Sequence, residues 1–157
     1  MTKEQIISIL SEVSDPEIPV LSITDLGILR NVDVCGKNIC IQITPTYSGC
    51  PAMETIQEDI RLTLAKHGLH HVEIEQSLSP AWTTDWMTES GKQKLQDYGI
   101  AAPAANGCLL QGGDQPSSCP LCHSEHIEQI SRFGSTACKA LYRCLDCLEP
   151  FDYFKCH

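Results

Sequence analysis

The chain has 157 residues, of which 20 are acidic and 11 are basic, so its net charge at neutral pH is −9. Residues 1–107 carry 14 acidic and 7 basic side chains, and residues 108–157 carry 6 and 4. Neither part offers the basic surface that nucleic-acid binding normally requires. No apolar run approaches the length of a membrane span, and the N-terminal segment lacks the apolar core of a signal peptide. We therefore expect a cytoplasmic protein that binds neither nucleic acid nor membrane.

The N-terminal segment carries the pattern of a short amphipathic helix. Thr2 and Gln5 have the spacing of a capping box, in which each side chain bonds a backbone N–H at the start of a helix. Apolar residues follow at helical spacing. The helix should end before the Asp15-Pro16 pair, because a residue that precedes proline is disfavoured in the α region.

Two strands, a second helix and a third strand follow. Residues 28–34 and 39–43 are rich in β-branched side chains and predict a hairpin. Pro51 favours the start of a helix that ends at Gly68, and residues 72–75 predict the third strand. The order α-β-β-α-β predicts a small α+β domain in which helices pack against a mixed sheet.

The composition changes after residue 80. Residues 81–107 predict a short helix and a linker, whereas residues 108–157 have few aliphatic side chains and hold most of the ten cysteines. A module of that size usually needs a staple, because its apolar core is too small to stabilise it. We therefore predict a domain at 1–80, a helix and linker at 81–107, and a cysteine-rich module at 108–157.

Two Cys-x-x-Cys pairs separated by 21 residues mark this module, and they are Cys119, Cys122, Cys144 and Cys147. Four thiolates at this spacing can close a tetrahedral shell around Zn²⁺, so the spacing predicts a zinc-ribbon-like module with a structural ion. Sulfurs that are free of metal would instead suit a thiol oxidoreductase. Cys138 is a spare thiol, and four further side chains flank the frame and could replace a ligand: His123, His126, Cys156 and His157.

Cys50 lies outside the zinc frame and immediately precedes the helix that starts at Pro51. Unpaired backbone N–H groups and the helix dipole favour an anion there, so we expect a lowered pKa and a thiolate available as a nucleophile or metal ligand. The alternative is a small, half-buried residue that only suits a helix start. Asp15, Glu17 and Asp25 are candidate partners, because carboxylates beside a thiolate could help to bind iron.

Three segments of the first 80 residues carry a resemblance, and they are 15–19, 25–27 and 44–51. Together they resemble a widespread domain of SufT-type proteins and of cytosolic iron–sulfur assembly targeting factors, which act in the maturation of iron–sulfur proteins. The resemblance implies that Cys50 is the functional residue and transiently holds iron or an iron–sulfur cluster. We count Asp15, Glu17, Asp25 and Thr46 with it as candidate binding residues.

The later part of the chain narrows the resemblance through segments 80–88, 133–140 and 149–157. With these segments, nearly the whole chain is similar to the PaaD (also PaaJ) family. That family is the small accessory subunit of the bacterial phenylacetyl-CoA ring 1,2-epoxidase system. There, a di-iron oxygenase subunit, a structural partner and an iron–sulfur flavin reductase perform the chemistry. The resemblance implies a role in maturation or iron–sulfur delivery for phenylacetate degradation, with these subunits, and the reductase above all, as partners.

What the residues themselves indicate agrees in part with the role of a non-catalytic accessory protein. We find no di-iron Glu-x-x-His pair on long helices and no Gly-rich dinucleotide loop. Since a cluster normally takes four protein ligands, we expect Cys50 to share ligation in a homodimer or with its client. The alternative is a structural subunit that docks the oxygenase to its reductase through the zinc module and a tryptophan pair. Trp82 and Trp86 lie four residues apart, which on a helix would place them on one face. We expect this pair to anchor the core, and a partner-binding patch is the alternative.

Overall fold

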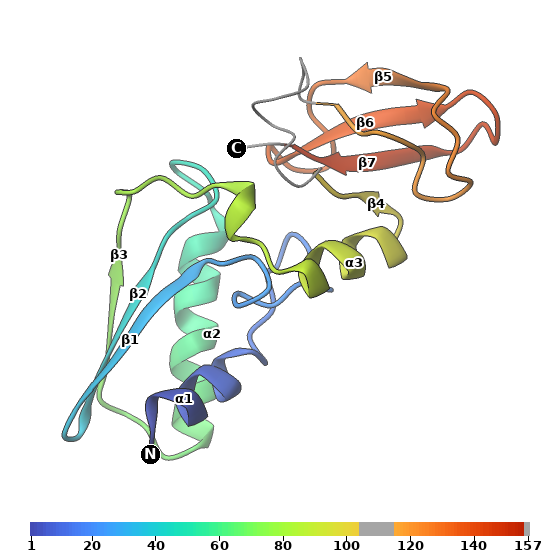
Figure 1. Cartoon of the computed structure of the whole chain (residues 1–157). Coiled ribbons are helices and arrows are strands. Elements are labelled where there is room, and N and C mark those ends of the chain that lie inside the picture. The colour runs from blue at the N-terminus through green and yellow to red at the C-terminus, as the bar shows by residue number, and fades with distance from the viewer. Residues whose placement is uncertain (104–114, 156–157) are drawn as a thin grey trace. The chain divides into compact units, whose positions relative to one another are not determined.

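The structure, a computed structural model, describes residues 1–103 and 115–155. The chain divides into two compact units, Met1–Thr88 and Glu89–His157 (Figure 1). In the described part of the chain, no helix combines the length and the apolar character that a membrane crossing needs.

The first unit contains the predicted α-β-β-α-β order. Its elements are α1 (Lys3–Leu10), β1 (Leu29–Cys35), β2 (Asn38–Ile43), α2 (Ala52–Lys66), β3 (Val72–Gln76) and the 3₁₀ helix η1 (Thr84–Trp86). The strand order is β1-β2-β3, with β1 antiparallel and β3 parallel to β2. Because α2 connects β2 to β3, the chain can return and add β3 in the parallel direction. The mixed sheet is therefore confirmed.

Helix starts and apolar spacing explain how this unit forms. Both bonds of the capping box at Thr2 and Gln5 are present. On β2, every second residue faces the core, and these residues are Ile39, Ile41 and Ile43. Helix α2 buries its apolar stripe, which consists of Ala52, Met53, Ile56, Ile60 and Leu64. The two helices and the sheet thus contribute to the apolar core, and the loop before β1 adds Ile18, Leu21, Ile23, Leu26 and Ile28 to it.

The second unit consists of α3 (Glu89–Asp97) and a four-stranded sheet. Its strands are β4 (Ile100–Ala101), β5 (Ile127–Ser131), β6 (Lys139–Cys144) and β7 (Pro150–Phe154), in the order β4-β7-β6-β5. Strands β5, β6 and β7 form an antiparallel meander, and β4 pairs with β7 in parallel. The unit begins before residue 108 because β4 joins its sheet.

An aromatic cluster supports the sheet of the second unit. The Tyr142 ring stacks on Phe151 and meets the edge of Tyr153 at centroid distances of 6.0 and 5.8 Å. Cys119 and Cys144 are fully buried in the same cluster. The core is small, and two of its members belong to the predicted zinc frame, which agrees with a zinc-ribbon-like module.

Candidate metal centre and thiol site

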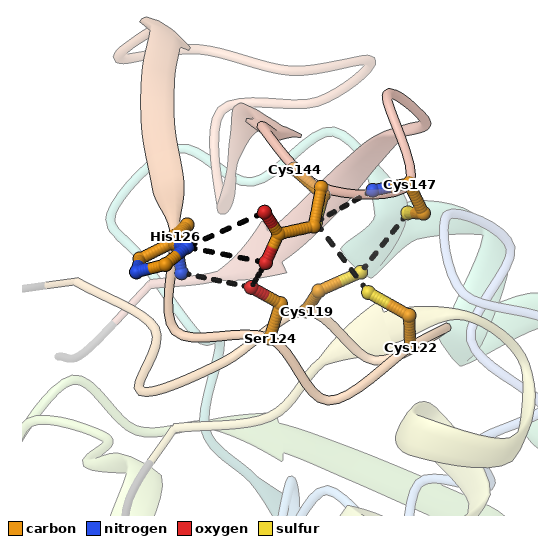
Figure 2. Close-up of polar contacts among 7 residues, drawn as sticks. Cys119, Cys122, Ser124, His126, Cys144 and Cys147 are labelled. Atoms are coloured by element: carbon orange, nitrogen blue, oxygen red, sulfur yellow. Dashed lines mark hydrogen bonds and ion pairs between the residues drawn. The ribbon is translucent and has the colours of Figure 1, made fainter.

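The predicted zinc ligands converge in the second unit, and they are Cys119, Cys122, Cys144 and Cys147 (Figure 2). The first pair lies on the loop before β5, and the second pair begins at the end of β6. Two sulfur pairs, from Cys119 to Cys147 and from Cys122 to Cys144, are 3.9 and 3.5 Å apart. All four sulfurs lie within 4.8 Å of one another. Thiolates about 2.3 Å from a tetrahedral zinc ion would be about 3.8 Å apart, so the donor set fits zinc.

Each Cys-x-x-Cys turn holds its first sulfur with a backbone N–H and ends in a left-handed residue. The N–H of Leu121 donates to the sulfur of Cys119 at 3.4 Å, and the N–H of Cys147 donates to that of Cys144 at 3.5 Å. The residue after each pair, His123 or Leu148, has a left-handed φ of 63° or 64°. This conformation costs a non-glycine residue about 1–2 kcal/mol. Both turns therefore accept local strain and direct their sulfurs to one point.

Within the closely packed cluster of four thiols, the pKa of Cys144 is lowered and that of Cys147 is raised. The backbone N–H of Cys147 is the largest influence on Cys144 and lowers its pKa to about 6. For Cys147, a backbone hydrogen bond at Glu149 favours the thiolate, but desolvation and the neighbouring thiols outweigh it and raise the pKa to about 12. Crowded thiols cannot all ionise without a cation, and a zinc ion would supply that charge.

The alternative ligands lie elsewhere. The Nδ1 atom of His126 contacts the Asp146 carboxylate at 3.2 and 3.3 Å, and His123 is exposed. Cys138 is buried, with its sulfur 3.0 Å from the hydroxyl of Thr136. Cys156 and His157 lie outside the described residues. Among described residues, the four cysteines form the metal-ligand group without help from these side chains.

Cys50 lies at the end of the loop between β2 and α2, in the position that the sequence predicts. Its N–H donates to the Tyr47 carbonyl at 3.3 Å, and its own carbonyl accepts from the N–H of Met53 at 3.3 Å. Pro51 is the N-cap residue of α2 and provides no side-chain hydrogen bond to the helix. The half-buried thiol therefore lies directly before the first turn of the helix.

The predicted lowering of the Cys50 pKa is wrong. Desolvation by burial is the largest influence and raises the pKa. A backbone hydrogen bond at Ala52 and a side-chain hydrogen bond with Tyr47 act in the opposite direction, as expected at a helix start, but they are weaker. The negative charges of Glu17 and Asp15 raise the pKa further. In the absence of a cation, Cys50 is thus held as the thiol.

Two predicted carboxylates, those of Glu17 and Asp15, act electrostatically on the Cys50 thiol. Asp15 is 6% exposed, and its Oδ1 accepts hydrogen bonds from the N–H groups of Glu17 and Ile18 at 2.7 and 2.9 Å. This turn fixes the backbone that carries Glu17. Thr46 is buried in the loop that leads to Cys50. The sequence could not establish this influence, because some 30 residues of chain separate the two loops.

Asp25 has a different position from Asp15 and Glu17. Its Oδ2 accepts hydrogen bonds from the N–H and the hydroxyl of Ser22 at 3.1 and 2.9 Å, and its Oδ1 accepts from the hydroxyl of Thr88 at 3.3 Å. Ser22 in turn pairs with Ser14 in an antiparallel bridge. The Asp25 carboxylate therefore closes the loop that carries Asp15.

The tryptophans do not share a helix face, because only Thr84–Trp86 is helical and Trp82 precedes it. Trp82 is buried in the first unit, whereas Trp86 is half-buried beneath Arg30, whose guanidinium carbon lies 3.6 Å from the ring centroid. A Cβ at Gly27 would lie 2.4 Å from the Trp86 carbonyl oxygen. Both tryptophans thus pack against the loop at 25–27, a contact that no pattern in the sequence indicates.

Each unit has relatives among known proteins. Residues 3–75 match the family described as iron–sulfur cluster assembly protein, and residues 104–155 match the PaaD zinc beta ribbon domain. The crystal structure of a domain of unknown function, DUF59, from Bacillus anthracis is similar to the first unit. It has a TM-score of 0.56 and 26% identity, and covers 59% of this chain and 90% of that chain. Fold and site together define a two-domain protein, an iron–sulfur assembly domain followed by a zinc ribbon.

Two curated relatives narrow this class. A protein of Escherichia coli (strain K12), provisionally named as a subunit of 1,2-phenylacetyl-CoA epoxidase, is 52% identical over 152 residues, which cover 97% of this chain and 92% of that protein. The Fe-S protein maturation auxiliary factor of Porphyromonas gingivalis (strain ATCC BAA-308 / W83) is 38% identical over 96 residues, which cover 60% of this chain and 90% of the factor. The chain therefore belongs to the PaaD family.

Proposed function

We propose that this chain is a non-catalytic maturation subunit of a phenylacetyl-CoA epoxidase system, in which Cys50 transiently holds iron or an iron–sulfur cluster for the reductase or the oxygenase. The name of the E. coli relative supports the role as an epoxidase subunit, and the name of the P. gingivalis relative supports the role in iron–sulfur maturation. The single observation that carries it is the electrostatic influence of Glu17 and Asp15 on the half-buried Cys50 thiol before α2.

The charges around Cys50 favour a cation over nucleophilic chemistry. Two carboxylates and desolvation keep the free thiol protonated, which makes it a poor nucleophile at neutral pH. The same negative charges would attract a metal cation, and a bound cation would in turn stabilise the thiolate. Thiolate and carboxylate ligands together suit iron, which accepts both types.

Cys50 would have to share the ligation of a cluster with other residues, because it is a single thiol. A [2Fe–2S] or [4Fe–4S] cluster normally takes four protein ligands. The other cysteines of the first unit, Cys35 and Cys40, lie on the β1–β2 hairpin, away from the loop of Cys50. The remaining ligands would come from a second copy of the chain or from the client, which suits a cargo that must leave again.

The zinc module would have a structural role. Four protein thiolates leave zinc no open position for substrate or water, and structural sites are closed in this way. With zinc bound, the two Cys-x-x-Cys pairs would not be available for thiol exchange, which counts against the oxidoreductase alternative.

The test compares wild type with Cys50→Ala after anaerobic purification and after co-expression with the reductase. We expect zinc near one equivalent in both proteins, iron absorption only in wild type, and a lower cluster content in the reductase that matured beside Cys50→Ala. Cys35→Ala is the matched control, since it removes an exposed thiol of the same unit. A reductase that acquires its full cluster content beside Cys50→Ala would contradict the delivery role.

Exposed leucines on the zinc turns favour docking as a second candidate function. Leu121, Leu145 and Leu148 are 53%, 46% and 69% exposed. The tryptophan pair suits this role less well, because Trp82 is buried in its own unit. If the chain only docks the other subunits, Leu121→Ser with Leu148→Ser should abolish co-purification, and Cys50→Ala should have no effect on cluster content.

A further inference from the structure

We propose that Asp146 is a positioning residue of the zinc ribbon, which ties the turn of Cys144 and Cys147 to the turn of Cys119 and Cys122 through Ser124 and His126. The proposed bridge lies in the zinc module alone and does not depend on iron handling at Cys50.

The side chain of Asp146 reaches from one turn to the other. Asp146 lies between the two cysteines of the second pair, and its carboxylate accepts a hydrogen bond from the hydroxyl of Ser124, which follows the first pair. The same carboxylate contacts Nδ1 of His126 at 3.2 Å. Two residues from the first turn therefore meet one carboxylate from the second.

Ser124 connects this contact to the first pair through the backbone. Its carbonyl accepts a 2.8 Å hydrogen bond from the N–H of Cys119. Its hydroxyl oxygen also accepts the N–H of His126 at 3.0 Å, which closes the local turn (Figure 2). The His126 carbonyl accepts the N–H of Leu145 at 2.8 Å, so a backbone bond runs parallel to the side-chain bridge. Ser124 is thus bonded to both turns at once.

The contact between Ser124 and Asp146 lowers the entropic cost of bringing two separate cysteine pairs to one zinc ion. Each turn already holds its own cysteine pair, through N–H to sulfur bonds and a left-handed residue. The pairing of Ile127 with Cys144 between β5 and β6 brings the two turns together, and the side-chain bridge further restrains the distance between them. Partners of this kind, beyond the direct ligands, typically change metal affinity by about 10–100-fold. A bridge between the turns lowers the entropy that zinc binding must otherwise remove.

The residue types Ser, His and Asp do not form a hydrolytic triad here. In a triad the imidazole accepts the proton of the serine hydroxyl, and the carboxylate orients the imidazole from the other side. The Ser124 hydroxyl instead bonds the carboxylate, and the oxygen accepts a backbone N–H. Nothing in this arrangement activates the serine, so positioning is the role that the geometry supports.

Zinc release from the full chain tests the proposal. The zinc-loaded protein is mixed with excess 4-(2-pyridylazo)resorcinol, and the rate at which the coloured zinc complex forms is recorded. We expect release about tenfold faster, or more, in Asp146→Ala and in Ser124→Ala. Asp146→Asn keeps an oxygen that can accept from Ser124, so its release should be intermediate. Glu125→Gln, an exposed acidic neighbour, is the matched control and should release zinc at the wild-type rate.

A double-mutant cycle separates the bridge from general destabilisation. If Ser124 acts through its hydrogen bond to Asp146, the double alanine variant should release zinc about as fast as Asp146→Ala alone. Multiplicative effects of the two substitutions, or wild-type release from Asp146→Ala, would overturn the proposal. Should Asp146→Ala fail to fold, Asp146→Asn and Ser124→Ala compared with Glu125→Gln still decide the question.

Discussion

The indole nitrogen of Trp82 donates a 2.8 Å hydrogen bond to the backbone oxygen of Leu26, although 56 residues separate the two in sequence. The Thr88 N–H similarly donates to the Asp25 carbonyl at 2.9 Å. The segment from Trp82 to Thr88 therefore completes the first unit and lies against the loop whose other end carries Asp15. The compact first unit thus ends at Thr88, beyond the residues 3–75 that match the iron–sulfur assembly family.

Trp82→Phe should destabilise the first unit by about 2–3 kcal/mol. The substitution leaves the buried Leu26 carbonyl without its donor and removes ring atoms from a packed site. Trp86→Phe should cost less, about 1 kcal/mol, because Trp86 is half-buried and loses mainly its contact with Arg30. Denaturant unfolding followed by fluorescence of the remaining tryptophan measures both. Equal losses would contradict the assignment of Trp82 as the anchor.

Gly27→Ala should destabilise the same unit more than Gly36→Ala. Both glycines have left-handed φ angles, of 71° and 66°, so either alanine adds about 1–2 kcal/mol of backbone strain. Only Gly27 also faces the Trp86 backbone, where a Cβ would lie 2.4 Å from the carbonyl oxygen, whereas a Cβ at Gly36 meets no atom within 4 Å. We expect a further loss of about 1–3 kcal/mol at Gly27 from overpacking. Tryptophan fluorescence during urea unfolding would report the difference.

Glu17→Gln should speed the alkylation of Cys50 at neutral pH. The carboxylate of Glu17 raises the Cys50 pKa, so its removal lowers the pKa and increases the thiolate fraction, which is the reactive form. We expect about a two- to fivefold higher rate with iodoacetamide for the metal-free protein. Peptide mass spectrometry resolves Cys50 from the other cysteines.

Glu58→Gln on helix α2 is the matched control for this charge effect and should leave the alkylation rate unchanged. An unaltered rate in Glu17→Gln would mean that the Glu17 carboxylate does not influence the Cys50 thiol. Cation binding by the carboxylates beside Cys50 would then lose its support.

Local patterns in the sequence predicted most of the fold and the ligand set of the zinc frame. Cys119 and Cys122 are held by one turn, as are Cys144 and Cys147, and turns are encoded within a few residues. The position of Cys50 before a helix is likewise encoded by neighbouring residues. The direction of its pKa shift could not be predicted in this way, because burial and the charge of Glu17 act on Cys50 through tertiary packing. The spacing of Trp82 and Trp86 suited a helix, but their packing against Leu26 and Gly27 also arises from tertiary structure; the burial of Trp82 agrees with a role as a core anchor.

Removal of zinc should unfold the second unit and leave the first intact. Cys119 and Cys144 are fully buried among Tyr142, Phe151 and Tyr153, so loss of the ion would place unpaired thiols in a small core that cannot stabilise itself. Hydrogen exchange with mass spectrometry on the EDTA-treated chain should show lost protection in β5, β6 and β7 and unchanged protection in β2 and α2. EDTA saturated with zinc is the control. Protection of β6 that survives complete zinc removal would show that the aromatic cluster holds the ribbon without the metal.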